Sequence, residues 1–322
     1  FLLLAIAYLY LRANSQKKYP VAYGLSFNRQ YAAAIGLVWQ DVYLKMLEEL
    51  KPKYVRLAAT WSETEPQAEK FNTADVDWQM AEAAKRNIKI VLVVGQKAPR
   101  WPECHIPEWT KKLNDEEYKI ALLNYVKYIV EKYQNNPALE IWQVENEPFI
   151  KFRFGECASF REDLVKDEIV LVHQLDSKHQ VVITDSGELS TWRKAGRAGD
   201  LFGTTLYRIV RTPTGRIWNY DWLPPAFYRL KAEFWKIPMQ NFFVSELQAE
   251  PWFTDSNPNN TPMVEQEKTM NPERLQKHFD YTERIGVSRA YLWGVEWWYW
   301  LKEKQSDARY WEMVKEKIAS SS

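Results

Sequence analysis

The sequence has few of the residues that usually bind metal ions or nucleotide phosphates. It contains two cysteines, four histidines and 11 glycines in 322 residues. There is no Cys-x-x-Cys or His-Glu-x-x-His spacing, and His173 and His179 lie six residues apart, which does not place two ligands on one helix face. No Gly-x-Gly-x-x-Gly follows a predicted strand. We therefore expect neither a metal ion nor a nucleotide cofactor.

An excess of either charge is also missing. Lys and Arg together number 43 against 42 for Asp and Glu, which gives a net charge of +1. There is no long basic run interleaved with aromatic residues, so the sequence does not favour nucleic acid as a partner. We expect an uncharged substrate and a monomeric protein.

Aromatic residues, in contrast, are abundant. The chain has 16 Trp and 18 Tyr, and the flat C–H faces of sugar rings stack well on flat aromatic rings. Most of these side chains are expected to fill the core, because Trp and Tyr bury large areas in any fold. Only aromatic residues at the ends of strands therefore favour a carbohydrate ligand.

The first eleven residues are apolar, and the sequence then becomes polar up to Lys18. Eleven residues are too few to span a bilayer. We interpret residues 1–18 as a membrane-targeting segment, which is either a signal-peptide core cleaved after Ser15 or the end of an N-terminal anchor. Residues 19–322 are then expected to form one catalytic domain.

From Tyr19 onward, short strand-like runs alternate with long amphipathic helices, a pattern typical of a parallel sheet with helical crossovers. Helix starts are indicated by Asn72-Thr73, by Asn114 before three acidic residues, and by Asn271 before Pro272. The repeats and the length predict a single-domain (β/α)8 TIM barrel. The expected strands lie at 21–27, 54–60, 88–95, 139–146, 181–184, 201–207, 241–246 and 289–294.

Two of these strands end in a carboxylate. The apolar strand 139–146 runs into Asn146-Glu147-Pro148, and the strand 241–246 ends at Glu246. Glu147 is our candidate general acid, because partial burial at a strand end can raise a carboxyl pKa toward neutrality. Two such carboxylates are the minimum for cleaving a glycosidic bond. The alternative is that Glu145 and Glu147 are ordinary solvated loop residues.

With these motifs, the chain resembles the clan of retaining (β/α)8-barrel glycoside hydrolases that includes the family 5 cellulases and mannanases. The resemblance covers about residues 20–300. It implies that Glu147 is the acid/base and Glu246 the nucleophile, that Asn146 binds the sugar 2-hydroxyl, and that Trp293 forms the floor of the −1 subsite. It also implies that Tyr207 donates a hydrogen bond to the nucleophile, although a locally satisfied core Tyr is an equally good interpretation.

Other candidate substrate-binding residues come from the neighbouring strand ends. Arg56 lies in an otherwise apolar strand and is expected to pair with Glu246, unless it forms a salt bridge in the barrel wall. Gln96 and Trp101 should lie at the mouth of the barrel, where family 5 enzymes often have a His and this chain has only His105 nearby. Glu296 should bind sugar hydroxyls or pair with a basic residue at the rim.

Two segments complete the sequence-based site. The aromatic run 297–300 should pack under the barrel or line the cleft, and the irregular segment 251–270 is a candidate substrate-binding loop. Cys104 and Cys157 follow adjacent strands and either form a disulfide or remain two free thiols.

We thus expect a retaining β-glycosidase that acts by double displacement on oligo- or polysaccharides, with the two carboxyl groups about 5 to 5.5 Å apart. A transglycosylase with the same residues and a non-hydrolytic sugar-binding barrel are the alternatives. A polymer-degrading enzyme meets its substrate outside the cell, so we expect the protein to be extracellular or anchored on the outer face of a membrane.

Overall fold

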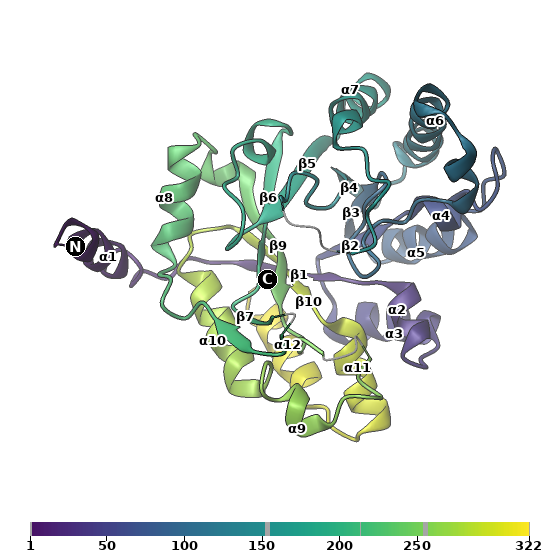
Figure 1. The fold of residues 1–322 in the computed structure, drawn as a ribbon. Coiled ribbons are helices and arrows are strands. Elements are labelled where there is room, and N and C mark those ends of the chain that lie inside the picture. The colour runs from purple at the N-terminus through teal and green to yellow at the C-terminus, as the bar shows by residue number, and fades with distance from the viewer. Residues whose placement is uncertain (1, 152–154, 213, 254–256, 322) are drawn as a thin grey trace. The chain divides into compact units, whose positions relative to one another are not determined.

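The fold is a barrel of parallel strands surrounded by helices (Figure 1). A computed structural model describes residues 2–151, 155–212, 214–253 and 257–321. Eight of the strands in these ranges close in the order β1-β10-β9-β6-β5-β4-β3-β2. The (β/α)8 barrel predicted from the sequence is therefore confirmed. The barrel strands are β1 (Ala22–Ser26), β2 (Tyr54–Ala58), β3 (Lys89–Val94), β4 (Leu139–Val144), β5 (Gln180–Ser186), β6 (Leu201–Leu206), β9 (Phe242–Gln248) and β10 (Arg289–Trp293).

The chain divides into two compact units, residues 53–203 and residues 1–52 with 204–322. The catalytic domain expected over residues 19–322 stays a prediction. Helices of the first unit are α4 (Trp61–Thr64), α5 (Ala74–Lys85), α6 (Asp115–Tyr133) and α7 (Val165–Leu175). Those of the second are α1 (Leu2–Ala13), α2 (Arg29–Ala34), α3 (Trp39–Lys45), α8 (Ala226–Phe234), α9 (Met263–Gln266), α10 (Pro272–Glu283), α11 (Val295–Lys304) and α12 (Arg309–Ser320).

In the unit 53–203, β2, β3, β4 and β5 pair in parallel. Apolar residues dominate both faces of β3, whose residues from Ile90 to Val94 are buried, as expected for a strand covered by helices. The Asn114 side chain caps α6 and forms a capping box with Glu117, so that this predicted helix start is confirmed.

In the unit 1–52 with 204–322, β1 and β9 pair with β10 on either side. Asn271 caps α10, whose first residue is Pro272, as predicted. Between β6 and α8, the short strands β7 (Ile209–Arg211) and β8 (Ile217–Asn219) form an antiparallel hairpin that the sequence did not indicate. This hairpin follows Tyr207 directly and belongs to the loop after β6.

Candidate active site

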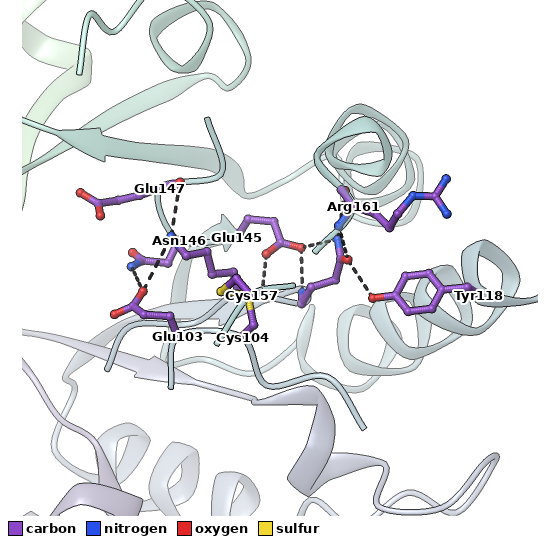
Figure 2. The surroundings of a disulfide bond; sticks show 10 residues. Glu103, Cys104, Tyr118, Glu145, Asn146, Glu147, Cys157 and Arg161 are labelled. Carbon is purple, nitrogen blue, oxygen red and sulfur yellow. Dashed lines mark hydrogen bonds and ion pairs between the residues drawn. A yellow bond between two sulfur atoms is a disulfide. The ribbon is translucent and has the colours of Figure 1, made fainter. Parts of the chain in front are cut away.

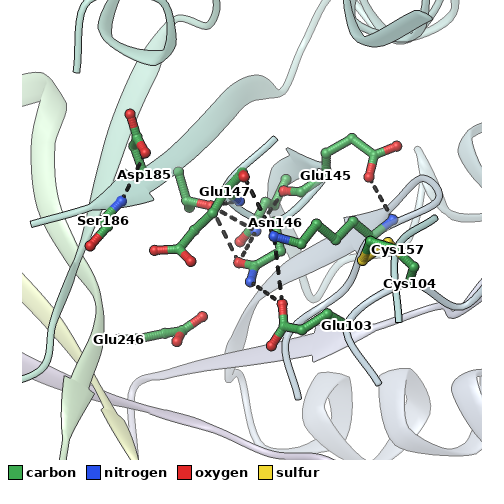
Figure 3. A network of polar contacts seen from close by, with 12 residues as sticks. Glu103, Cys104, Glu145, Asn146, Glu147, Cys157, Asp185, Ser186 and Glu246 are labelled. Carbon is green, nitrogen blue, oxygen red and sulfur yellow. Dashed lines mark hydrogen bonds and ion pairs between the residues drawn. A yellow bond between two sulfur atoms is a disulfide. The ribbon is translucent and has the colours of Figure 1, made fainter. Parts of the chain in front are cut away.

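The segment that carries Glu147 leaves β4 through two residues in the left-handed backbone region. The φ angles of Glu145 and Glu147 are 60° and 45°. In an uninterrupted strand these two side chains would share a face, because side chains alternate with a period of two. The turn separates them instead, and Figures 2 and 3 show the two carboxyl groups pointing in opposite directions. Glu147 is half-buried, whereas Glu145 is fully buried.

Arg56 of β2 holds the residues just before Glu147. Its Nε donates to Gln143 Oε1 at 2.8 Å and its Nη2 donates to Asn146 Oδ1 at 2.9 Å. The guanidinium is almost fully buried, and these charge-assisted hydrogen bonds satisfy part of its donor capacity. Arg56 therefore positions the end of β4. The expected contact between Arg56 and Glu246 stays a prediction.

Thr184 of β5 fixes the turn from the other side. Its hydroxyl accepts a hydrogen bond from the Glu147 backbone N–H at 2.9 Å and donates to Asn146 Oδ1 at 3.3 Å. The Asn146 amide also donates to Glu103 Oε2 at 3.2 Å (Figure 3). Thr184 and Glu103 were not identified from the sequence, because nothing in their local patterns connects them to Asn146. The contact of Asn146 with a sugar hydroxyl stays a prediction.

A disulfide anchors the loop that carries Glu103. Cys104 and Cys157 are bonded, with Cα atoms 5.1 Å apart (Figure 2), so the first of the two sequence-based alternatives is confirmed. The Lys97 ammonium lies 3.8 Å from Glu103 Oε2 and donates to the Glu147 backbone O at 3.5 Å. The loop after β3 thus contacts the candidate acid/base through its backbone.

Gln96 and Trp101, both expected at the mouth, differ sharply in exposure. Gln96 is fully buried, and its Oε1 accepts hydrogen bonds from the Tyr118 hydroxyl at 2.8 Å and from the Arg161 N–H at 3.0 Å. This placement differs from the expectation, because Gln96 offers no accessible atom to a ligand here. Trp101 is 53% exposed and is available to a ligand.

In the unit 1–52 with 204–322, Glu246 lies on β9 and is only 5% exposed. The Tyr207 hydroxyl donates to Glu246 Oε2 at 3.0 Å, which confirms the hydrogen bond that the resemblance implied. Tyr207 packs on Trp252 in an edge-to-face arrangement, with 5.7 Å between the ring centroids. Trp252 is an additional aromatic residue beside the candidate nucleophile that the sequence did not single out.

Trp293, at the end of β10, is held by the carboxylate of Glu250. Its indole Nε1 donates to Glu250 Oε1 at 2.9 Å. The chain then turns at Gly294, where φ is 148° and a Cβ atom would lie 2.9 Å from the Ala249 carbonyl oxygen, so that only glycine fits. The role of Trp293 as the floor of a subsite stays a prediction.

Glu296 and the aromatic run that follows lie in α11. Glu296 is 1% exposed and accepts a hydrogen bond from the Asn28 N–H at 2.5 Å. This backbone partner differs from both expected partners, a sugar and a basic residue at the rim. A role in substrate binding stays a prediction.

The run 297–300 packs in the core. This corresponds to the first of the two alternatives, packing under the barrel, and not to lining the cleft. The Trp297 and Trp298 side chains are fully buried, and their indoles donate to Gln266 Oε1 and the Ala249 backbone O at 2.7 Å each. Trp300 donates to Asn259. The bonds to Gln266 and Asn259 attach α11 to the predicted substrate-binding loop 251–270, which contains α9 and of which residues 254–256 lie outside the described residues.

The described residues contain no group of three or more His, Cys, Asp or Glu side chains that could hold a metal ion. The candidate catalytic groups are carboxylates, one in each of the two units. Each of the two, Glu147 and Glu246, has polar neighbours that fix its position, and the strand order makes β4 the fourth and β9 the seventh strand of the barrel.

Comparison with known proteins points in the same direction. A family model described as glycoside hydrolase 42, β-galactosidase, matches residues 37–166. A GH5_18 protein from Bifidobacterium longum subsp. infantis is similar in structure, with a TM-score of 0.60, 15% identity and coverage of 85% of this chain and 69% of that one. The chain is therefore similar to the clan of (β/α)8-barrel glycoside hydrolases.

Two further structures extend the similarity to other glycoside hydrolases. For a β-galactosidase from the psychrophilic Marinomonas ef1, the TM-score is 0.57 at 13% identity, covering 85% of this chain and 54% of that one. For a psychrophilic family 10 endo-β-1,4-xylanase, the TM-score is 0.51 at 14% identity, covering 88% of both chains. This chain thus spans about half the length of that β-galactosidase. No curated protein matches the sequence.

Proposed function

We propose that this protein is a retaining β-glycosidase. The observation that carries the proposal is the position of two carboxylates on a closed (β/α)8 barrel, with Glu147 directly after the fourth strand, β4, and Glu246 near the C-terminal end of the seventh strand, β9. The C-terminal ends of barrel strands are where such enzymes place their catalytic residues. The family match over residues 37–166 supports glycosidase activity independently and includes Glu147.

In the proposed reaction, Glu246 attacks the anomeric carbon while Glu147 protonates the departing oxygen. Glu147 then removes a proton from a water molecule, which attacks the glycosyl-enzyme ester and releases the sugar and free Glu246. Tyr207, which donates to Glu246 Oε2, would keep the attacking carboxylate oriented. Asn146 would bind the 2-hydroxyl, where hydrogen bonds strengthen in the transition state.

The balanced charge of the chain supports an uncharged sugar substrate. A GH5_18 relative from Bifidobacterium longum subsp. longum was solved with Manβ1-4GlcNAc, and other similar structures are β-galactosidases. A test panel should therefore include aryl β-galactosides and β-mannosides beside β-glucosides, β-xylosides and soluble polysaccharides. Transfer products on added acceptor sugars would identify a transglycosylase.

The roles of the two carboxylates can be tested with a good substrate of that panel. We expect Glu246→Ala to abolish turnover of every substrate, and Glu147→Ala to retain turnover of substrates whose leaving groups need no protonation and to regain rate with azide. Glu108→Ala removes a side chain carboxylate that is 84% exposed and serves as the control. Equal losses for Glu147→Ala on activated and unactivated substrates, without an azide effect, would contradict the assignment.

The stereochemistry of the first product gives a second, independent test. Proton NMR should show the β-anomer first, because a carboxyl separation of about 5 to 5.5 Å leaves no room for a water molecule between sugar and nucleophile. An initial α-anomer would show inversion and would rule out double displacement.

A further inference from the structure

Two buried carboxyl groups lie behind the Glu147 turn and take no part in the proposed reaction. Glu145 follows β4, Glu168 comes from α7, and both are fully buried. They meet over Gly95, where a Cβ atom would lie 2.5 Å from Glu145 Oε1 and 3.0 Å from Glu168 Oε2. Glycine at position 95, with φ 117°, leaves the space that the two carboxyl groups occupy.

The two groups differ in their hydrogen-bond donors. Glu145 accepts bonds from the Gln96 N–H at 2.7 Å and the Lys97 N–H at 2.6 Å, and these two donors favour its ionised form over that of Glu168. Glu168 Oε1 lies 3.5 Å from the Gln96 amide nitrogen, and Glu168 Oε2 is buried without a donor among the described residues. A buried acceptor without a donor is costly. A proton on Glu168 Oε2, donated to Glu145, removes that cost.

Among the described residues, the charged groups near this pair have other partners. The Arg161 guanidinium points away from Glu145 (Figure 2) and is paired with Asp115 and Asp163 at 2.8 Å. The Lys97 ammonium lies against Glu103, and Asp167 on α7 is paired with Lys119. From α6, Tyr118 donates to Gln96 and Tyr125 donates to the Ala59 carbonyl, and burial raises the pKa of both phenols, so they stay neutral.

Burial therefore decides the protonation of this pair. It raises the pKa of Glu145 to about 7, and it raises the pKa of Glu168 well above the usual range, with the Glu145 charge adding to the effect. At neutral pH the pair keeps a proton. In the unfolded chain both groups would titrate near 4.5.

We propose that Glu145 and Glu168 share one proton, carried by Glu168, and that this pair is the positioning device that holds the Glu147 turn in its active geometry. Glu145 binds the backbone of the loop after β3, and Lys97 of that loop donates to the Glu147 carbonyl. Loss of the proton places two like charges in the core and releases these contacts. The positioning role rests on the proposed glycosidase function, whereas the shared proton does not.

The direction of the pH effect follows from the raised pKa values. The folded protein binds the shared proton more tightly than the unfolded chain does, so the pair stabilises the fold fully below about pH 4.5. This stabilisation declines as pH rises through the raised pKa values of the pair, of which that of Glu145 is about 7 and that of Glu168 is also well above the usual range. The kcat of the enzyme should fall on the alkaline side for the same reason.

The test compares Glu168→Gln, which keeps a neutral donor at the same place, with Glu168→Ala, which removes it. Asp167→Asn is the matched control, because it removes the neighbouring carboxylate, which is 42% exposed. The Tm, measured by thermal unfolding from about pH 5 to about pH 9, should decrease with rising pH for the wild type and for Asp167→Asn. It should decrease less for Glu168→Gln. An infrared band of a protonated carboxyl group should be present in the wild type at neutral pH and missing in Glu168→Gln.

The kinetic measurement tests the positioning role. Glu168→Gln should keep kcat near the wild-type value and lose its alkaline decline, whereas Glu168→Ala should lower kcat by about 100-fold, as expected for a misplaced catalytic group. Parallel unfolding slopes for Glu168→Gln and the wild type, with the infrared band retained, would overturn the shared proton. An unchanged alkaline decline of kcat in Glu168→Gln would overturn the positioning role. If no variant, including the wild type, hydrolyses any glycoside, the proposed function fails, while the unfolding and infrared measurements still decide the shared proton.

Discussion

The Tyr207 hydroxyl donates a hydrogen bond directly to the candidate nucleophile, Glu246. The hydroxyl lies 3.0 Å from Oε2 of a carboxylate that is almost fully buried, where water cannot easily replace it. A hydrogen bond to a charged group contributes about 1.5–3 kcal/mol, more than a neutral one. We expect Tyr207→Phe to lower kcat/KM by about 10- to 100-fold.

Steady-state kinetics on an aryl glycoside would measure this effect. Tyr281→Phe is the matched control, because it deletes a hydroxyl that donates to the Leu223 carbonyl at 2.8 Å in the same unit. The control should lose stability in urea and keep its kcat/KM. Equal kinetic effects of the two substitutions would show that the Tyr207 hydroxyl has no specific role at Glu246.

For single residues, the sequence indicated which positions to consider better than it indicated where their side chains point. Glu147 and Glu246 were chosen as candidates because each follows a strong apolar run. The burial of Glu145 was not predicted, because the left-handed φ at this residue breaks the alternation of side chains between the two faces of the strand. Gln96 was placed at the mouth for a related reason, since its burial depends on partners from α6 and from the segment before α7.

A disulfide ties the loop after β3 to the segment after β4. The Cys104–Cys157 bond joins residues 53 positions apart, and Glu103 beside it binds the Asn146 amide. On the chain-entropy model, closing a loop of this length stabilises the fold by about 4 kcal/mol. We expect the double variant Cys104→Ser, Cys157→Ser to lose stability of this order in urea unfolding.

Reduction provides the internal check on that prediction. A reductant should destabilise the wild type and leave the double Ser variant unchanged. Two titratable thiols in denatured, unreduced protein would show that the bond is not formed.

The strands and capped helices were predictable because their signals are local. Each barrel strand is an apolar run bounded by polar residues, and Asn114 and Asn271 start their helices with the expected side-chain bonds. The β7–β8 hairpin was missed because its strands have three residues each and all three residues of β8 are exposed, so there is no burial pattern to detect. Glu296 was expected at a rim because its position at the start of a buried helix depends on the turn at Gly294.

At the scale of the whole molecule, the alternation of strands and helices was sufficient to predict a (β/α)8 barrel. It did not predict the division into the units 53–203 and 1–52 with 204–322, which depends on contacts between residues far apart in the sequence. The amino-acid composition likewise did not predict which aromatic residues lie near the candidate nucleophile. The abundance of Trp favoured a sugar ligand, yet Trp142, Trp297 and Trp298 are fully buried, whereas Trp252 packs on Tyr207 beside the candidate nucleophile.

The N-terminal helix α1 exposes several large apolar side chains. Leu3, Ile6 and Leu9 are 82%, 54% and 64% exposed, and basic residues follow from Arg12 to Lys18. Within the described ranges, no helix combines the length and the apolar character needed to cross a bilayer. We propose that α1 attaches the protein to a membrane surface by inserting these side chains among the lipids, with the basic residues at the headgroups.

Vesicle flotation with anionic and neutral lipids tests this attachment. Burying one Leu side chain contributes about 1.5–3 kcal/mol, so Leu9→Glu should lower the partition coefficient by at least about tenfold. Val264→Glu introduces the same charge at a residue of α9 that is 68% exposed, and it should leave partitioning unchanged. Equal partitioning of both variants and the wild type would remove the support for a lipid-binding α1, because the exposed apolar residues of this helix would then have no measurable affinity for the bilayer.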